Sequence, residues 1–357
     1  MPYNIYETAR LIQAVEGINP ADSFLRDRYF PSNGTADIFN SEKVLCEYKD
    51  GDMRVAPIIL QRQGGIALSR TAARMFEYEP PTVAPKRPLT LDEVKVRGFG
   101  EALYGDKSPA QRAQIMVMQD LIELDNSITR REEVMAASTL LNNGCTMKAI
   151  GDDASKFEEY EVRFYEGDVN PASYAVAKKW DDPDADILGD LNAMASMLTR
   201  RGLAASDFVC APDVADSVLN NNGVQRMLDN RRIEIGTAAP KLEATGAAVV
   251  CQLNVRGRII SIISYDQVYT DSDGSTKQYI PAGCGSMTAP NAGHTVYGAV
   301  TQVEQSDGEM HTYAKSRVPK YIADANADTR ELRLTARPLC LPYNRDPFIS
   351  AKSLTSE

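Results

Sequence analysis

The chain has 357 residues, of which 43% are hydrophobic and 25% are charged, and its formal net charge is −10. This composition provides enough apolar side chains for packed cores and excludes a predominantly disordered chain, and the length is typical of two or three domains. The acidic balance argues against a general nucleic-acid-binding protein, which needs a basic surface to displace counterions. It is compatible with a protein that encloses DNA without gripping it.

The sequence contains no stretch of about 20 apolar residues that could span a bilayer, and residues 1–7 lack the basic and then apolar pattern of a secretion signal. We therefore expect a soluble, cytosolic protein without a membrane partner. The cysteines lie tens of residues apart without a C-x-x-C pair, so we expect small buried hydrophobic residues and no disulfide framework. They are Cys46, Cys145, Cys210, Cys251, Cys284 and Cys340.

The first 100 residues contain extended segments and turn signals. Residues 1–45 combine a short helical pattern with turn signals such as Asn19-Pro20, which predicts an arm with little core of its own. Residues 54–61 are β-prone, and Gln63-Gly64-Gly65 predicts a hairpin turn before a return strand. Four prolines in residues 79–88 then favour a stiff extended linker. Because an isolated hairpin is marginally stable in water, we expect this one to rest on something else.

The clearest predicted element is a long helix at about 109–141. Ser108 is a suitable N-cap, Pro109 suits the first helical position, and Gln111 completes the capping pattern. No Pro or Gly interrupts the apolar periodicity before Asn142-Asn143-Gly144, which predicts the stop. A helix of this extent is about 50 Å long, which suggests a spine that spans a flat molecule.

The remainder of the chain predicts a mixture of strands and shorter helices, so the fold class is α+β. A strand pair surrounds residues 151–153, and a hairpin crosses Arg256-Gly257. Strand patterns also occur at residues 207–212 and 332–336, and residues 269–274 form a turn between further strands. Helical patterns occur at residues 187–198, 213–219 and 223–230.

No metal or catalytic site emerges from the residue pattern. His294 and His311 have no ligands at a useful spacing, so structural or surface roles are favoured over zinc binding. Residues 271–275 resemble the start of a calcium loop, but the required Gly and Glu positions do not match, and a hairpin turn explains them. The acidic run 181–186 could supply paired catalytic carboxylates, but capping of the following helix is the better interpretation.

The remaining candidates also have structural interpretations. Residues 283–286 lack the spacing of a phosphate loop or of a nucleophile elbow, which favours a plain glycine loop. Arg26, Arg28 and Arg62 could contact acidic partners or DNA, although scattered arginines are more often solvated or paired at interfaces. We therefore predict no catalytic residue, no metal and no cofactor.

Several short motifs, each weak alone, follow one another along almost the whole chain. Residues 22–30 read DSFLRDRYF, and residues 81–86 read PTVAPK. In their order and separations the motifs resemble the lambda-type major capsid proteins of tailed phages, the capsid protein E family. The other segments that carry the resemblance are 39–44, 55–59, 180–183, 279–281, 317–320, 336–342 and 346–350.

The resemblance implies the Hong Kong 97-type capsid fold and a shell of hexamers and pentamers that encloses double-stranded DNA without sequence-specific binding. It implies a virion location and separate scaffold, portal and, in some relatives, decoration proteins. It also places an assembly interface at Arg26, Arg28, Arg62, Gly64, Gly65, Arg70 and Lys86. The implied divisions are an N-terminal arm (1–45), an extended E-loop region (46–100), a peripheral P-domain with the spine helix (101–180), an axial A-domain (181–300) and a return to the P-domain (301–357).

Two alternatives remain open at this point. An encapsulin-like compartment shell would share the fold but hold enzyme cargo. An α+β enzyme with an unrecognised site would form a small soluble oligomer and turn over a substrate.

Overall fold

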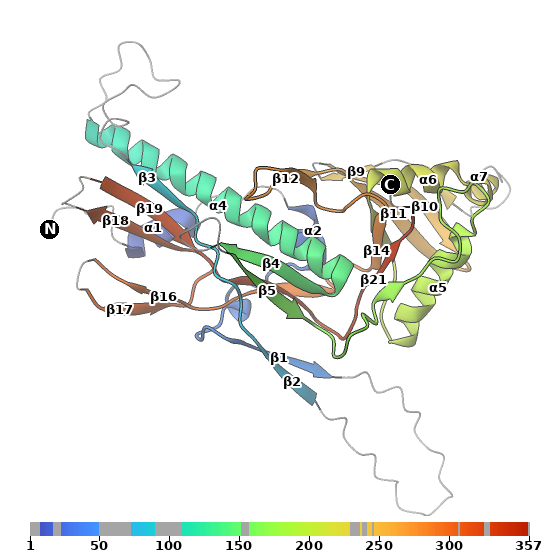
Figure 1. Ribbon diagram of the computed structural model, residues 1–357, viewed down its shortest axis with the longest axis horizontal. Coiled ribbons are helices and arrows are strands. Elements are labelled where there is room, and N and C mark those ends of the chain that lie inside the picture. The colour runs from blue at the N-terminus through green and yellow to red at the C-terminus, as the bar shows by residue number, and fades with distance from the viewer. Residues whose placement is uncertain are drawn as a thin grey trace, which may run out of the picture.

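A computed structural model describes residues 8–16, 23–49, 73–89, 109–150, 157–228, 236–237, 241–244, 246–305, 308–324 and 329–355. Helices and strands are mixed along the chain (Figure 1), which confirms the α+β class. The molecule has two parts: a sheet region, built on one eight-stranded sheet with three helices, and a spine region, in which small sheets surround one long helix. None of the helices in these ranges is both long and apolar enough to cross a bilayer.

The spine region is organised by helix α4 (Pro109–Asn142), whose 34 residues correspond to about 50 Å. This helix confirms the element predicted at 109–141. It lies across an antiparallel sheet of order β18-β19-β3 (Figure 1), formed by β18 (Val318–Asp324), β19 (Thr329–Thr335) and β3 (Lys86–Leu89). The cluster between helix and sheet includes Val117, Leu121, Leu124, Ile128, Leu332 and Leu334.

The end of α4 differs in detail from the predicted glycine stop. Asn143, with φ 52°, takes the left-handed position that ends the helix. Gly144 instead begins β4 (Gly144–Ile150), which pairs with β5 (Phe157–Arg163) and confirms the predicted strand pair. A Cβ on Gly144 would lie 2.6 Å from the carbonyl oxygen of Val162, so glycine is required by close strand contact.

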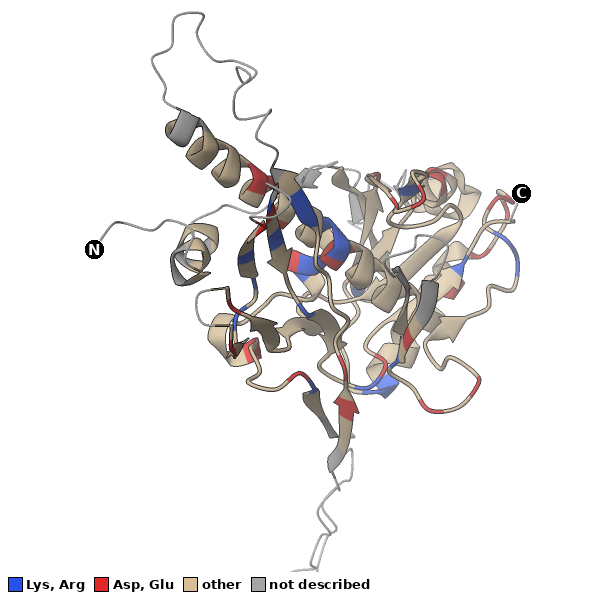
Figure 2. Cartoon of the chain, turned by 60° about the vertical axis from the view of Figure 1, so that its left-hand side comes forward, with Lys and Arg blue, Asp and Glu red and all other residues tan. Residues whose placement is uncertain are grey.

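Three two-stranded ribbons complete the spine region. The ribbon of β1 and β2 points away from the body in both views (Figures 1 and 2). The predicted strand 54–61 and the turn at Gln63-Gly64-Gly65 lie outside the described residues. The ribbon strands are β1 (Val44–Lys49) with β2 (Ala73–Tyr78), β15 (Gly293–Tyr297) with β20 (Pro338–Pro342), and β16 (Val300–Val303) with β17 (Met310–Tyr313).

The sheet region has the strand order β6-β21-β14-β7-β11-β10-β8, with β9 also paired to β10. The hairpin predicted across Arg256-Gly257 is confirmed, and both residues have positive φ (50° and 87°), as a tight two-residue turn requires. The strands are β6 (Ser173–Tyr174), β7 (Asp207–Cys210), β8 (Gly236–Thr237), β9 (Lys241–Ala244), β10 (Ala247–Val255), β11 (Arg258–Tyr265), β14 (Cys284–Thr288) and β21 (Ile349–Lys352). The helices are α5 (Ile187–Arg200), α6 (Pro212–Asn220) and α7 (Asn222–Leu228), and a side ribbon contains β12 (Val268–Thr270) and β13 (Thr276–Gln278).

Both faces of the eight-stranded sheet are buried. On β7, Phe208 and Cys210 join the cluster made with α5, α6 and α7, whereas Val209 between them joins the cluster that contains Met135 and Leu140 of α4. Successive side chains of a strand point to opposite faces. The sheet therefore packs against its own helices on one face and against the end of the spine on the other.

The N-terminal segment contains α1 (Thr8–Glu16), α2 (Phe24–Tyr29) and a 3₁₀ turn (Gly34–Asp37). The arm was predicted to have little core of its own, and α2 instead packs into the core formed by the rest of the chain. Leu25 and Tyr29 are fully buried in the cluster that joins α4 to the sheet. A six-residue helix gave too short a pattern for this burial to be recognised from periodicity.

Candidate assembly interface

The first turn of α2 is capped by a side chain from α4. Ser23 occupies the N-cap position but makes no capping hydrogen bond. Instead, the backbone N–H groups of Leu25 and Arg26 donate to the two carboxylate oxygens of Glu133, at 2.7 and 2.9 Å. The hydroxyl of Tyr265 on β11 donates to the same carboxylate at 2.8 Å. One buried carboxylate thus joins the arm, the spine and the sheet region.

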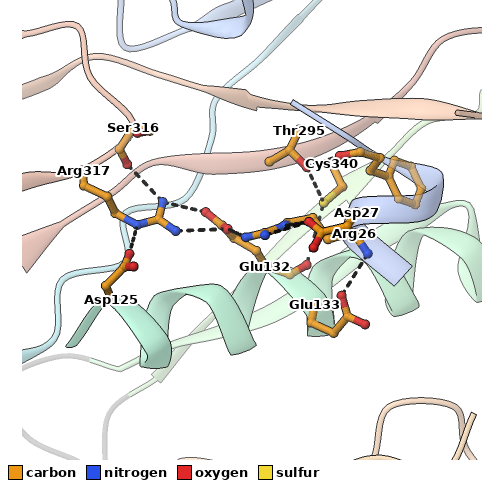
Figure 3. Close-up of polar contacts among 10 residues, drawn as sticks. Arg26, Asp27, Asp125, Glu132, Glu133, Thr295, Ser316, Arg317 and Cys340 are labelled. Atoms are coloured by element: carbon orange, nitrogen blue, oxygen red, sulfur yellow. Dashed lines mark hydrogen bonds and ion pairs between the residues drawn. The ribbon is translucent and has the colours of Figure 1, made fainter. Parts of the chain in front are cut away.

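The neighbouring residue of α4 is the centre of a buried ion network (Figure 3). Glu132 is fully buried and accepts from Arg26 at 2.7 Å and from Arg317 at 2.8 and 3.1 Å. Arg317, which precedes β18, also donates to Asp125 at 2.7 Å. Asp125 lies about two turns before Glu132 on the same side of α4. The network therefore ties α2 and the start of β18 to the same side of the spine helix.

The electrostatic balance of the two neighbouring glutamates differs. Burial disfavours the ionised form of Glu132, but Arg317 and Arg26 outweigh burial and lower its pKa. At Glu133, burial dominates and raises the pKa, although the hydrogen bonds from Arg26, Leu25 and Tyr265 oppose it. Glu132 is thus held as an ion by two arginines, and no arginine side chain hydrogen-bonds to Glu133 among the described residues.

The structure brings together only some of the residues predicted to form the interface. Arg26 binds Glu132, and Arg28 donates to Asp207 of β7 at 2.8 Å, so both arginines have partners within the subunit. Lys86 is exposed and lies 3.5 Å from Glu331. Contact of these residues with another copy stays a prediction. The other four, Arg62, Gly64, Gly65 and Arg70, lie outside the described residues.

Exposed apolar side chains identify surfaces that the sequence analysis missed. On the β1–β2 ribbon, Leu45 and Met75 are 53% and 62% exposed. Leu45 lies between the buried residues Val44 and Cys46, and Met75 precedes Phe76, the strand partner of Cys46, so both apolar side chains lie on the outer face. The inner face, which includes Val44 and Cys46, packs against the core.

Two further patches lie on other elements. On the β16–β17 ribbon, Val303 and Met310 are directly paired, and they are 42% and 77% exposed. On α4, Ile115, Met118 and Ile122 follow helical spacing and are each about 40% exposed. The three patches lie on different elements. They are identified by strand register and by helix packing, which the pattern of a single sequence does not give.

The residues weighed as sites of chemistry have structural roles. Asp186 caps α5 by accepting from the backbone N–H of Gly189, which confirms the capping interpretation. His294 contacts Asp37 at 3.0 Å, and burial lowers its pKa although Asp37 opposes the shift. The predicted glycine loop at residues 283–286 is wrong beyond Gly283, because Gly285 lies in strand β14, where a Cβ would meet the ring of Phe208 at 2.6 Å.

The cysteines and the acidic turn at residues 271–275 also have structural roles. All six cysteines are free, and five of them are buried, as predicted. Asp271 and Asp273 flank a turn between β12 and β13 and bind Lys277 at 2.6 and 3.4 Å. Within the described ranges, no group of three or more His, Cys, Asp or Glu side chains could hold a metal ion.

Comparisons with known proteins agree with this arrangement. The sequence matches the family described as phage major capsid protein E over residues 7–353. It is 22% identical to the major capsid protein of Escherichia phage lambda over 353 residues, which cover 98% of this chain and 99% of that protein.

Solved structures share the fold. A prophage capsid protein from Escherichia coli CFT073 has a TM-score of 0.63 and 16% identity, with 98% of this chain and 99% of that chain covered. A phage-related protein from Bordetella bronchiseptica RB50 has a TM-score of 0.50 and 9% identity, with 97% of each chain covered. The chain belongs to the phage major capsid protein E family and is a structural protein of the virion capsid.

Proposed function

We propose that copies of this chain assemble through heterologous contacts into hexamers and pentamers, which tile the icosahedral shell of a tailed phage. In a heterologous contact, one surface of a subunit meets a different surface on the next copy, and such contacts close into rings when the rotation allows. The separate apolar patches on the β1–β2 ribbon, the β16–β17 ribbon and α4 support this proposal, because each provides a different surface for a neighbour.

The observation that carries the proposal is the β1–β2 ribbon. It projects from the body (Figure 1) and exposes Leu45 and Met75 on one face. Two-stranded ribbons are marginal in water, and burial of these two side chains would contribute a few kcal/mol at about 25 cal/mol per Å² of apolar area. A neighbouring subunit would supply the covering surface.

The domain divisions of a Hong Kong 97-type subunit are part of the proposal. The ribbon would be the base of an E-loop region at 46–100, following an arm at 1–45. Helix α4 would be the spine of a P-domain at 101–180 and 301–357. The sheet region would form the axial A-domain at 181–300, although β21 (Ile349–Lys352) also joins that sheet from the C-terminal segment.

We further propose that the subunit has no catalytic activity and encloses double-stranded DNA without sequence-specific contacts. Its net charge of −10 supports an inner wall that does not adhere to DNA. A scaffold and a portal protein, and in some circumstances a decoration protein, would be its assembly partners. The family match favours a phage shell over an encapsulin-like compartment, and DNA in place of enzyme cargo would distinguish the two.

The first test is expression of the full chain, alone and with its phage's scaffold, followed by electron microscopy and sedimentation. We expect closed shells, or rings of six and five subunits, tens of nanometres across. A homogeneous small oligomer that persists at high concentration with scaffold present would contradict the proposal.

The second test concerns the ribbon. The double variant Leu45→Ser, Met75→Ser should reduce the yield of shells at least severalfold, while the unfolding midpoint of the unassembled subunit stays close to that of the wild type. Val169→Ser is the matched control, since Val169 is 82% exposed but lies outside the three patches. Equal shell yields for the ribbon variant and the control would exclude the ribbon as an interface.

A further inference from the structure

The outer face of the β18-β19-β3 sheet carries a row of three basic residues. The strand register places Lys320, Arg333 and Lys86 side by side on adjacent strands. Because side chains alternate along a strand, these residues lie opposite Leu332 and Leu334, which pack toward α4. Figure 2 shows Lys and Arg positions gathered on the strands beside the long helix.

The three cations are not equally neutralised. Lys86 lies 3.5 Å from Glu331. Burial and the charge of Arg333 lower the pKa of Lys320, which Glu304 partly opposes. The side chain of Arg333 makes no hydrogen bond or ion pair with any other residue in the described part of the chain. Its Nε is shielded from solvent and has no acceptor there.

A second donor without an acceptor lies next to Arg333. The hydroxyl of Thr335, two residues farther on the same face of β19, is buried and has no partner among the described residues. Both side chains line a cavity of about 380 Å³. Its acidic walls, Glu42 and Glu79, already bind Arg337 at 3.2 and 3.3 Å. The two carboxylates and two guanidiniums of this lining balance in formal charge, and Arg333 is the guanidinium for which the described residues supply no hydrogen-bond acceptor.

We infer that this cavity receives a carboxylate side chain from a neighbouring copy of this chain, which accepts hydrogen bonds from the guanidinium of half-buried Arg333. A guanidinium matches a carboxylate in shape and charge. A half-buried guanidinium that binds no carboxylate lacks its usual hydrogen-bond partner. Each copy has 49 acidic and 39 basic residues, so acids are in excess on its neighbours. The inference rests on the proposed shell, in which neighbours are identical chains.

A nucleic-acid phosphate is the less favoured occupant. Binding of a DNA backbone draws its affinity from several cations acting together. Here Lys86 lies near Glu331 and Lys320 is attracted by Glu304, so Arg333 is the cation of this row that has no ion-pair partner among the described residues. One such guanidinium suits a single carboxylate group.

The test compares Arg333→Met with Arg330→Met in the full chain under assembly conditions. Arg330 lies on the same strand, but it is exposed and belongs to the other face. We expect Arg333→Met to raise the protein concentration needed for shell formation by at least about tenfold. This is the change in affinity expected when one charge-assisted hydrogen bond is lost. The unassembled Arg333→Met subunit should unfold at the wild-type midpoint or above it, because a poorly solvated charge is removed. Arg330→Met should match the wild type in both measurements.

A third variant and a DNA comparison complete the test. Arg333→Lys keeps the charge but loses the planar fork, and it should restore assembly only in part. Wild-type assembly by Arg333→Met, or an equal loss of subunit stability and of assembly, would overturn the inference. An effect confined to DNA-filled particles, with empty shells unchanged, would assign the site to phosphate and overturn it as well. Failure of the wild type itself to assemble would instead contradict the proposed function.

Discussion

The sheet region and the spine region bury their side chains in different ways. In the sheet region, Leu191, Val214 and Ile262 lie in an apolar cluster closed by α5, α6 and α7. The buried carboxylate of Asp190 on α5 accepts hydrogen bonds from the neutral side chains of Trp180 and Tyr174. In the spine region, the contacts between segments include the buried charges of Glu132 and Arg317. The spine region also carries most of the exposed large apolar side chains described above, on its ribbons and on α4.

This difference indicates what each region does. A sheet covered on both faces is complete within one chain, so the sheet region needs little from a neighbour to be stable. The small sheets and ribbons around α4 leave some of their apolar side chains exposed, and specific polar contacts hold them in place. The spine region therefore has surfaces left for other copies, and the predictions below test this contrast from the largest expected effect on subunit stability to the smallest.

The largest effect should come from the buried ion network. Arg317→Met leaves Glu132 and Asp125 without a shared cation in a site where both side chains are at most 7% exposed. We expect the free energy of unfolding to fall by about 4 kcal/mol, as when one partner of a buried ion pair is removed. Urea denaturation of the unassembled subunit measures it. Arg163→Met is the control, because Arg163 is exposed and pairs only with exposed Glu161. A loss no larger than that of the control would show that the network does not hold the spine region together.

The next effect should come from the apolar core of the sheet region. Leu191 on α5 is fully buried, and Leu191→Ala removes its apolar side chain from the cluster under α5, α6 and α7. The expected loss is about 3 kcal/mol from transfer and cavity formation. Thermal unfolding of the subunit measures it at neutral and at acidic pH. The loss should be the same at both pH values, and a strong pH dependence would contradict the proposed difference between the regions.

Local patterns predicted most of the secondary structure but not the contacts between segments. The bounds of α4 and the turn at Arg256-Gly257 depend on adjacent residues, and both were predicted within a residue or two, while the predicted N-cap Ser108 lies outside the described residues. By contrast, Glu132 and Arg317 are separated by 185 positions, and no local pattern joins them. Arg26 was assigned to an interface on its position alone, whereas the structure gives it an internal partner. Single-sequence patterns do not contain this information, because it arises when distant segments pack.

A smaller effect on subunit stability, which depends on pH, is expected from the ionisation of Glu132. The pKa of Glu132 is lowered in the folded state from its ordinary value of 4.5. Its ionised form therefore stabilises the fold above that pH, and this stabilisation is lost as the pH falls through and below it. Glu132→Gln removes the titration. We expect the difference in unfolding free energy between wild type and variant to narrow by at least about 1 kcal/mol between pH 7 and pH 3.5. A difference that stays constant over this range would show that Glu132 acts by shape and hydrogen bonding alone.

The smallest effect on the subunit should come from the β16–β17 ribbon. Val303 and Met310 form a cross-strand pair whose side chains are largely in solvent, so the double variant Val303→Ser, Met310→Ser removes little burial from the isolated chain. Its unfolding midpoint should therefore stay near that of the wild type, and its shell yield should fall. Ile259→Ser is the control in the sheet region, where Ile259 is 65% exposed as a single apolar side chain beside a turn. If both variants assemble equally well, exposure of apolar side chains in the spine region is no guide to assembly. If the ribbon variant alone fails, the region with the less complete core is the one that neighbouring copies complete.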